Sequence, residues 1–308
     1  MILTLAKQVL IMFLLAGVGF VMFKTKKITP EGSKTIGNIL IFLSLPCVII
    51  NSFLINRTRE SLIALGLSAL AAAVVLAIAI LVSRIFFKKD PIAAFSASFS
   101  NPGFFGVPLI VGSLSSGAVF YVAAFIAFLN LLQWTYGVAI MTGEKKGLKP
   151  MAVLKAPFMI AILIGLFFFL TGLPMPAMIG SVISTIAAVN TPLAMFTVGI
   201  YLAQADILKM VRRKKLYAVS AVRLLLIPVI SLAVLSLLPG SLGGVPMMEM
   251  RTAILIAAAC PVGSNVAVYA QLHGKDHTYA VETVVISTLF SVLTIPGIVW
   301  LSQLLWVK

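Results

Sequence analysis

The sequence predicts an all-α polytopic membrane protein with ten transmembrane helices, arranged as two inverted five-helix repeats in which the fourth helix of each repeat is broken. Composition supports the class: 61% of the 308 residues are hydrophobic and 10% are charged, whereas soluble domains carry about 25% charged residues. The spacing of the apolar segments supports the number of helices. The distribution of lysine and arginine supports the inverted arrangement.

Ten apolar segments are long enough to cross a bilayer, for which a helix needs about 20 residues. We expect them at Leu5–Phe23, Ile36–Leu54, Leu62–Val82, Ala93–Val111, Val119–Met141, Ala156–Leu173, Val182–Ala203, Leu216–Leu238, Thr252–Gln271 and Tyr279–Leu301. The sixth segment is slightly short, and Pro157 marks its start. The first segment lacks a small-residue cleavage pattern, so we expect it to be retained as a helix.

The basic residues lie mainly in alternate loops. If the loops between helices are numbered from one to nine, the odd loops hold 17 of the 23 lysine and arginine residues, and the even loops hold Arg57, Arg59 and Arg251. Because positively charged loops stay in the cytoplasm, we expect the odd loops inside and both termini outside the plasma membrane. The net charge of +15 then reflects topology, and nucleic-acid binding is not expected.

A charged connection, Gly143–Lys155, divides the chain into two parts. Residues 1–150 are expected to form the first five-helix repeat, and residues 151–308 the second. An odd number of crossings in the first repeat makes the second enter the membrane from the opposite side. The positions of the breaks agree with this pairing, because Pro102 and Pro261 each lie in the fourth helix of their repeat.

Two apolar segments carry proline, glycine and asparagine where a membrane helix is otherwise uniformly apolar. One reads Phe99-Ser100-Asn101-Pro102-Gly103-Phe104-Phe105-Gly106-Val107-Pro108, and the other reads Cys260-Pro261-Val262-Gly263-Ser264-Asn265. Proline removes a backbone donor and clashes with the preceding turn, so each helix is expected to open there. Open backbone at membrane depth is tolerated only where protein or a water-filled cavity satisfies it. Two such breaks at corresponding positions of two halves indicate the binding site of a membrane carrier.

The opened helices free backbone amides beyond each proline, and the amide end of a helix favours anions. We therefore expect a site for a small organic anion, formed near the two breaks and on the fifth helix. The candidate substrate-binding residues are Asn101, Pro102, Gly103, Asn130, Gln133, Pro261, Gly263, Ser264 and Asn265. Asn130 and Gln133 are three residues apart and share a helix face. Hydrogen bonding between helices is the alternative role for both of them.

A few charged residues lie inside or near the expected spans. We interpret Arg223, about seven residues into the eighth segment, as an anchor whose side chain reaches the inner interface, with substrate attraction or gating as the alternative. His273, His277 and Glu282 are expected to form a solvated cluster, with a proton relay as the alternative. None of the eight acidic residues lies at the centre of a span, which weakens the case for tight cation coupling. No enzymatic constellation, cofactor or metal site is expected.

The chain resembles the auxin efflux carrier family, which includes the plant PIN-FORMED proteins and shorter prokaryotic malate or malonate permeases. The resemblance covers essentially the whole chain. It rests on Ser100–Leu109 in the fourth helix, Thr191–Gly199 in the seventh and Ala259–Ala270 in the ninth, while Asn130 followed by Trp134 is similar to the family's fifth-helix pattern. The family implies that broken helices 4 and 9 cross, with helices three to five and eight to ten around the crossing. The short central connection favours a prokaryotic organic-acid carrier over an auxin carrier.

The sequence leaves three functions open. The first is an alternating-access carrier for a small organic anion such as a mono- or dicarboxylate. The second is a membrane sensor or partner-binding protein with the carrier fold, whose expected mark is an appended soluble domain. The third is an anion channel, which needs a continuous polar stripe, whereas the polar residues here gather at the two breaks. The expected partners are the anion and the lipid bilayer, and a homodimer remains open.

Overall fold

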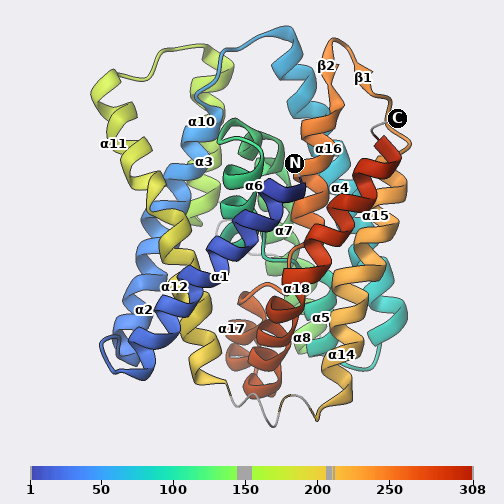
Figure 1. Cartoon of the computed structure of the whole chain (residues 1–308). Helices are drawn as coiled ribbons and strands as arrows, with labels where there is room; N and C mark the ends of the chain where they lie inside the picture. The colour runs from blue at the N-terminus through green and yellow to red at the C-terminus, as the bar shows by residue number, and fades with distance from the viewer. Residues whose placement is uncertain (1, 144–154, 206–209, 211, 307–308) are drawn as a thin grey trace.

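The computed structural model describes residues 2–143, 155–205, 210 and 212–306, and these residues are almost entirely helical (Figure 1). Within them, seven helical stretches are long and apolar enough to cross a membrane, at Leu3–Lys24, Pro30–Phe53, Arg59–Phe87, Gly117–Thr142, Ala177–Gln204, Lys214–Leu235 and His277–Trp306. Two shorter apolar stretches are Pro102–Ser113 and Pro157–Thr171. The chain is therefore a helical polytopic membrane protein, as predicted. The predicted boundary between residues 150 and 151 lies outside the described residues.

The helices of the first part of the chain include several short turns labelled η, which are wide π-helical turns except for η3. They are α1 (Ile2–Lys24), α2 (Pro30–Ile39), η1 (Leu40–Ser44), α3 (Leu45–Phe53), α4 (Arg59–Phe87), α5 (Pro91–Ser98), η2 (Pro102–Gly106), α6 (Val107–Ser113), the 3₁₀ turn η3 (Gly117–Val119), α7 (Phe120–Leu132), η4 (Gln133–Gly137) and α8 (Val138–Thr142). The later elements are α10 (Pro157–Thr171), α11 (Ala177–Ala188), α12 (Asn190–Gln204), α14 (Lys214–Ala221), η5 (Val222–Leu226), α15 (Ile227–Leu235), β1 (Ser241–Leu242), β2 (Val245–Pro246), α16 (Met247–Ala259), α17 (Asn265–Leu272) and α18 (His277–Trp306).

Three of the π-helical turns lie just before a proline. The turn η1 precedes Pro46, η2 precedes Pro108, and η5 precedes Pro228. A proline inside a helix has no N–H to donate and collides with the carbonyl one turn earlier, so the preceding turn widens. These prolines therefore reshape their helices without ending them, whereas Pro102 and Pro261 lie at breaks between helices.

Both predicted breaks are present. In the first, α5 ends at Ser98 and helical structure resumes at Pro102, with Phe99 in an extended conformation (φ −115°, ψ 111°). In the second, α16 ends at Ala259 and α17 begins at Asn265, while Cys260 is at φ −58° and ψ 150°. This conformation follows from sequence, because the residue before a proline is pushed out of the helical region.

The two breaks lie against each other and satisfy each other's backbone groups. Ser100 and Val262 form an antiparallel bridge. The Asn101 N–H donates to the Pro261 carbonyl at 2.9 Å, and the Gly263 N–H donates to the Phe99 carbonyl at 2.9 Å. Interruption of two helices would otherwise leave buried amides and carbonyls without partners, at a cost of about 1–3 kcal/mol each. Pairing of the breaks explains how open backbone persists inside the protein.

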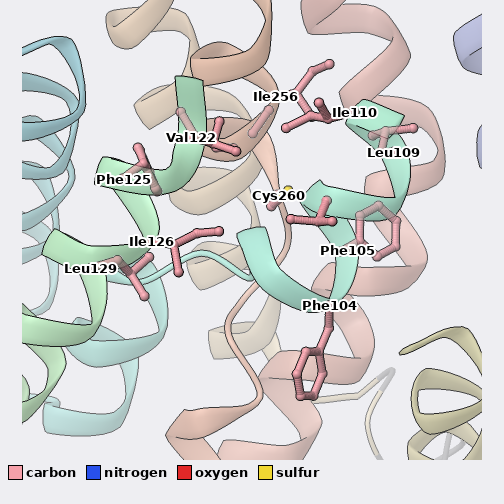
Figure 2. Close-up of a cluster of buried hydrophobic side chains, with 14 of the residues drawn as sticks. Phe104, Phe105, Leu109, Ile110, Val122, Phe125, Ile126, Leu129, Ile256 and Cys260 are labelled. Atoms are coloured by element: carbon pink, nitrogen blue, oxygen red, sulfur yellow. The ribbon is translucent and has the colours of Figure 1, made fainter. Parts of the chain in front are cut away.

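Buried apolar side chains fill the space around this crossing, as Figure 2 shows. The labelled residues are Phe104, Phe105, Leu109, Ile110, Val122, Phe125, Ile126, Leu129, Ile256 and Cys260. Packing is tight where η2 meets the end of α16, because a Cβ at Gly106 would lie 3.0 Å from the Cys260 sulfur. The two broken segments therefore share one packed core with α7.

The remaining helices pack in two groups. In the first, α1 lies along α12, and α3 packs on α10 and α11. Small residues allow the close approach of α1 and α12, since a Cβ at Gly199 would overlap the Ala16 carbonyl and one at Gly19 would lie 2.5 Å from the Phe196 carbonyl. In the second group, α4 packs on α5 and α7, while α16 packs on α15 and α18. Both broken segments belong mainly to the second group.

One short element departs from the purely helical prediction. The strands β1 and β2 form an antiparallel hairpin in which Leu242 pairs with Val245. Gly243 and Gly244 form its turn with φ of 58° and 85°, the pair of positive values that a tight hairpin turn requires. In Figure 1 this hairpin and the α10–α11 connection lie at the top, while the α1–α2 connection lies at the bottom.

Candidate functional site

A cavity of about 220 Å³ lies beside the crossing of the two breaks. Eight of the nine predicted site residues line it: Asn101, Pro102, Gly103, Asn130, Gln133, Gly263, Ser264 and Asn265. Pro261 does not line it, and its carbonyl oxygen accepts from the Asn101 N–H at the crossing. Sequence reasoning missed the other lining residues, which are Ile41, Leu45, Ser100, Phe104, Ile126, Leu129, Trp134, Ala156, Pro157 and Phe158.

Asn101 begins the helical stretch that follows the first break. Its side-chain oxygen accepts a bond from the Phe104 N–H at 3.2 Å, and its backbone oxygen accepts from the N–H groups of Phe105 and Gly106, each at 3.1 Å. Asparagine is one of the residues that favour this capping position. With its oxygen engaged, the polar group that Asn101 retains is its amide NH₂, which is a donor.

Asn265 joins the second break to the turn η4 that follows α7. Its amide nitrogen donates to the side-chain oxygen of Gln133 at 2.8 Å. Gln133 begins η4 and is only 1% exposed. This bond uses one donor of Asn265 and one acceptor of Gln133, so the Gln133 NH₂ remains as a further donor at the cavity.

Asn130 lies one turn before Gln133, as its spacing predicted. Its amide nitrogen donates to the Ile126 carbonyl of its own helix at 2.8 Å. The side-chain oxygen is therefore the group left for other partners. Asn130 and Gln133 do share the wall of one cavity, and the wide turn η4 begins directly after them.

The electrostatic character of the cavity comes from neutral groups. Among the residues that the structure describes, no side chain that lines the cavity is charged at neutral pH. Two helical stretches begin at its wall, one at Pro102 and one at Asn265. The amino end of a helix carries roughly half a positive charge from its free N–H groups. The site thus combines donors of Asn101 and Gln133 with two helix starts, a combination suited to a small anion.

Apolar residues also line the cavity. They include Leu45, Phe104, Ile126 and Phe158, and no motif distinguishes them from ordinary core residues. Ser100 lies among the missed residues too, although its position next to Asn101 in the break was a usable signal. Its hydroxyl is buried and makes no hydrogen bond within the described part of the chain.

Two further cavities share lining residues with this one. A small cavity of about 10 Å³, which is space for about one water molecule, shares Asn101, Phe104 and Ser264 with the first cavity. It shares Tyr201 with a third cavity of about 140 Å³. The small cavity itself is too narrow for an organic anion.

Arg223 does not reach the inner interface, so the expected snorkelling is wrong, while its side chain is anchored inside the protein. The side chain is 1% exposed. It donates to the carbonyls of Ala97 at 3.0 Å and Ser98 at 3.3 Å, and also to the carbonyl of Ala258. The guanidinium turns inward because the ends of α5 and α16 offer free carbonyls that lipid does not.

The expectation of a solvated cluster around Glu282 is wrong as well. Glu282 is only 6% exposed. It forms an ion pair of 2.8 Å with Arg213, which precedes α14, and Arg213 is 4.0 Å from Asp276. His277 is exposed and lines the third cavity instead. The burial of Glu282 requires a cationic partner, which the sequence placed 69 residues away.

The helical membrane fold and its buried cavity at two crossed breaks are those of a membrane transporter rather than an enzyme. A sequence model of the family described as "Membrane transport protein" matches residues 4–299. The chain belongs to this family, and the predicted resemblance to auxin efflux carriers is confirmed. It is 26% identical over 307 residues to a protein of Rhizobium meliloti (strain 1021) described as "Putative malonate transporter", and the match covers 92% of each chain.

Proposed function

We propose that the protein is an alternating-access carrier for a small organic anion, with dicarboxylates as the favoured class. The observation that carries this proposal is the cavity beside the crossed breaks, which combines amide donors and two helix starts, with no charged side chain among its described lining residues. A carboxylate can be held by such preorganised donors. The relative described as a malonate transporter supports a dicarboxylate in particular.

The size of the cavity supports a small substrate. Sites for drug-sized ligands measure about 300–1,000 Å³, whereas this one measures about 220 Å³. The apolar lining residues Leu45, Phe104 and Phe158 suit the methylene part of such a molecule. The amide donors suit its carboxylates.

We further propose ten membrane crossings in two inverted repeats. The seven long stretches supply seven crossings, α10 supplies an eighth, and the broken pairs α5–α6 and α16–α17 supply the last two. With basic loops in the cytoplasm, both termini lie outside the plasma membrane. The site then lies between the two packing groups, since η1, α3 and α10 line it from one group and α7 from the other.

Alternating access is favoured over a channel because the small cavity that also borders Asn101 and Ser264 has room for about one water molecule. Relative movement of the two packing groups would open one side as it closes the other. Membrane potential is a sufficient driving force. A monoanion that crosses about 100 mV changes its energy by about 2.3 kcal/mol, which corresponds to a concentration ratio of roughly fiftyfold.

The test is a thermal-shift screen of the purified protein with mono- and dicarboxylates. A ligand that binds the folded state raises the apparent melting temperature. Asn101→Ala and Asn265→Ala are expected to abolish this ligand-dependent rise while the protein stays folded and monodisperse. Asn51→Ala is the matched control, because Asn51 lies in α3 and is not among the residues that line the cavity. Unchanged carboxylate affinity in both cavity variants would remove them from the site.

Counterflow in proteoliposomes distinguishes the remaining functions. A carrier exchanges labelled for unlabelled carboxylate and saturates with concentration. A channel passes current without saturation in this range, and a sensor binds the ligand without flux. Binding with no flux in either direction would contradict the carrier proposal.

A further inference from the structure

Arg223 connects the two broken helices at the ends that lead into the breaks. Its guanidinium bonds the carbonyls of Ala97 and Ser98, the last two residues of α5, and the carbonyl of Ala258, next to last in α16. The side chain is 1% exposed and belongs to η5 of a third helical stretch. One cation therefore contacts the carboxyl ends of both half-helices.

The charge of Arg223 matches what these helix ends present. The carboxyl end of a helix carries roughly half a negative charge from its free carbonyls. Two such ends together approach one elementary charge, which one guanidinium neutralises. Within the described part of the chain the ion pairs are formed by Arg213 and Lys215, and Arg223 takes part in none of them. Backbone carbonyls are therefore its counter-charge.

Carbonyls of this kind are ligands for cations in transporters with broken helices. Unwound backbone and the carboxyl ends of half-helices there coordinate the coupling ion. In this chain the guanidinium already occupies three such carbonyls. An added metal cation at this position would meet a fixed positive charge in a buried environment, where repulsion between charges is strong.

We infer that Arg223 is a tethered cation that occupies the place of a coupling ion between the two half-helices, and thereby makes transport independent of sodium. Arg223 is a positioning residue in this scheme, because it holds the ends of α5 and α16 and so sets where the helix starts at Pro102 and Asn265 lie. Two experiments test this inference. The measurement of carboxylate transport rests on the proposed carrier function, and the measurement of thermal stability does not.

The stability measurement compares Arg223→Ala with Arg251→Ala by melting temperature in choline, sodium and guanidinium chloride at equal ionic strength. Arg251 is a matched control, because it is 5% exposed, donates to the Leu238 carbonyl at 3.0 Å and lies 4.7 Å from the Trp306 ring. We expect low-millimolar guanidinium to raise the melting temperature of the Arg223 variant and sodium to raise it to a smaller extent. The wild type and the Arg251 variant should respond to neither cation.

The transport measurement follows carboxylate flux in proteoliposomes. Wild-type flux should be equal in sodium and choline. Arg223→Ala should lose about tenfold or more of its flux in choline, since a single hydrogen bond to a charged group has an effect of that order, and should recover flux as guanidinium or sodium is added. A purely structural arginine would not make flux depend on the concentration of a small cation.

Arg223→Gln covers the case in which the alanine variant fails to fold. The glutamine amide can donate to one of the carbonyls but supplies no charge, so we expect this variant to fold and to acquire the same cation response. Wild-type flux that stops without sodium overturns the inference. So does the absence of any cation response in both Arg223 variants. If the wild type carries no carboxylate, the proposed function fails, and the melting temperatures still decide the role of Arg223.

Discussion

Gly263 is the residue at which a single methyl group should separate the two breaks. A Cβ at this position would lie 2.9 Å from the Ser100 carbonyl oxygen and 3.3 Å from the Phe99 carbonyl oxygen. Both atoms belong to the backbone of the first break, so no side chain can rotate away. Gly263→Ala therefore forces the two segments apart.

The magnitude follows from the bonds that the separation disturbs. Forcing extra volume into a packed core costs about 1–3 kcal/mol. The Gly263 N–H bond to the Phe99 carbonyl and the Asn101 N–H bond to the Pro261 carbonyl, each 2.9 Å long, would lengthen as well, and each buried bond contributes about 1 kcal/mol. We expect a total loss of about 2–4 kcal/mol, which lowers the melting temperature by about 5 °C or more.

The assay is thermal unfolding of the purified variant, with carboxylate binding measured in parallel. Gly17→Ala is the control, because Gly17 lies in α1 and has nothing within 4 Å of the added Cβ. An exposed Gly-to-Ala change inside a helix is expected to be neutral or to stabilise by up to about 1 kcal/mol. A Gly263→Ala protein that melts with the wild type and binds carboxylate equally well would refute the reasoning about the crossing.

Three further predictions concern the membrane topology, the ion pair between Arg213 and Glu282, and the cavity residue Gln133. In a background without the two buried native cysteines, an impermeant thiol reagent outside intact cells should label Arg57→Cys and spare Lys88→Cys, both positions being exposed; the reverse pattern would invert the topology. Arg213→Ala should lower the melting temperature more than Glu282→Gln, because only the former leaves a buried carboxylate without its cationic partner. Equal shifts in melting temperature would show that the unpaired charge does not determine the loss of stability. Gln133→Met should lower the free energy of unfolding by about 1–2 kcal/mol, because it removes the acceptor of the 2.8 Å bond from Asn265, and it should weaken carboxylate binding. A variant with the melting temperature and carboxylate affinity of the wild type would exclude Gln133 from the binding site.

Most of the membrane architecture could be predicted from the sequence because its causes are local. A segment of about 20 apolar residues crosses a bilayer whatever its neighbours are. A proline opens or widens the helix that contains it, so the breaks at Pro102 and Pro261 were expected from the residues alone. The eight cavity-lining residues among the predictions were found for the same reason, since polar groups and helix breakers inside apolar segments are costly unless they serve a site.

Sequence reasoning could not predict which partner each buried polar group would find. The Arg223 guanidinium contacts the Ala97 carbonyl across 126 positions of the chain, and Arg213 contacts Glu282 across 69. Local sequence placed Arg223 at a depth from which snorkelling was reasonable. Only the folded packing brought the carbonyl ends of two half-helices within its reach.

The sequence by itself determined the class of protein, the long apolar helices and the two places where a helix is broken, because hydrophobicity and the geometry of proline act within a few residues. The tertiary structure decided that the breaks pair through Ser100 and Val262, that Pro261 does not line the cavity, and that apolar residues such as Phe158 do. The physical reason is that a backbone donor released by one break has no preferred partner until another segment presents an acceptor at hydrogen-bonding distance.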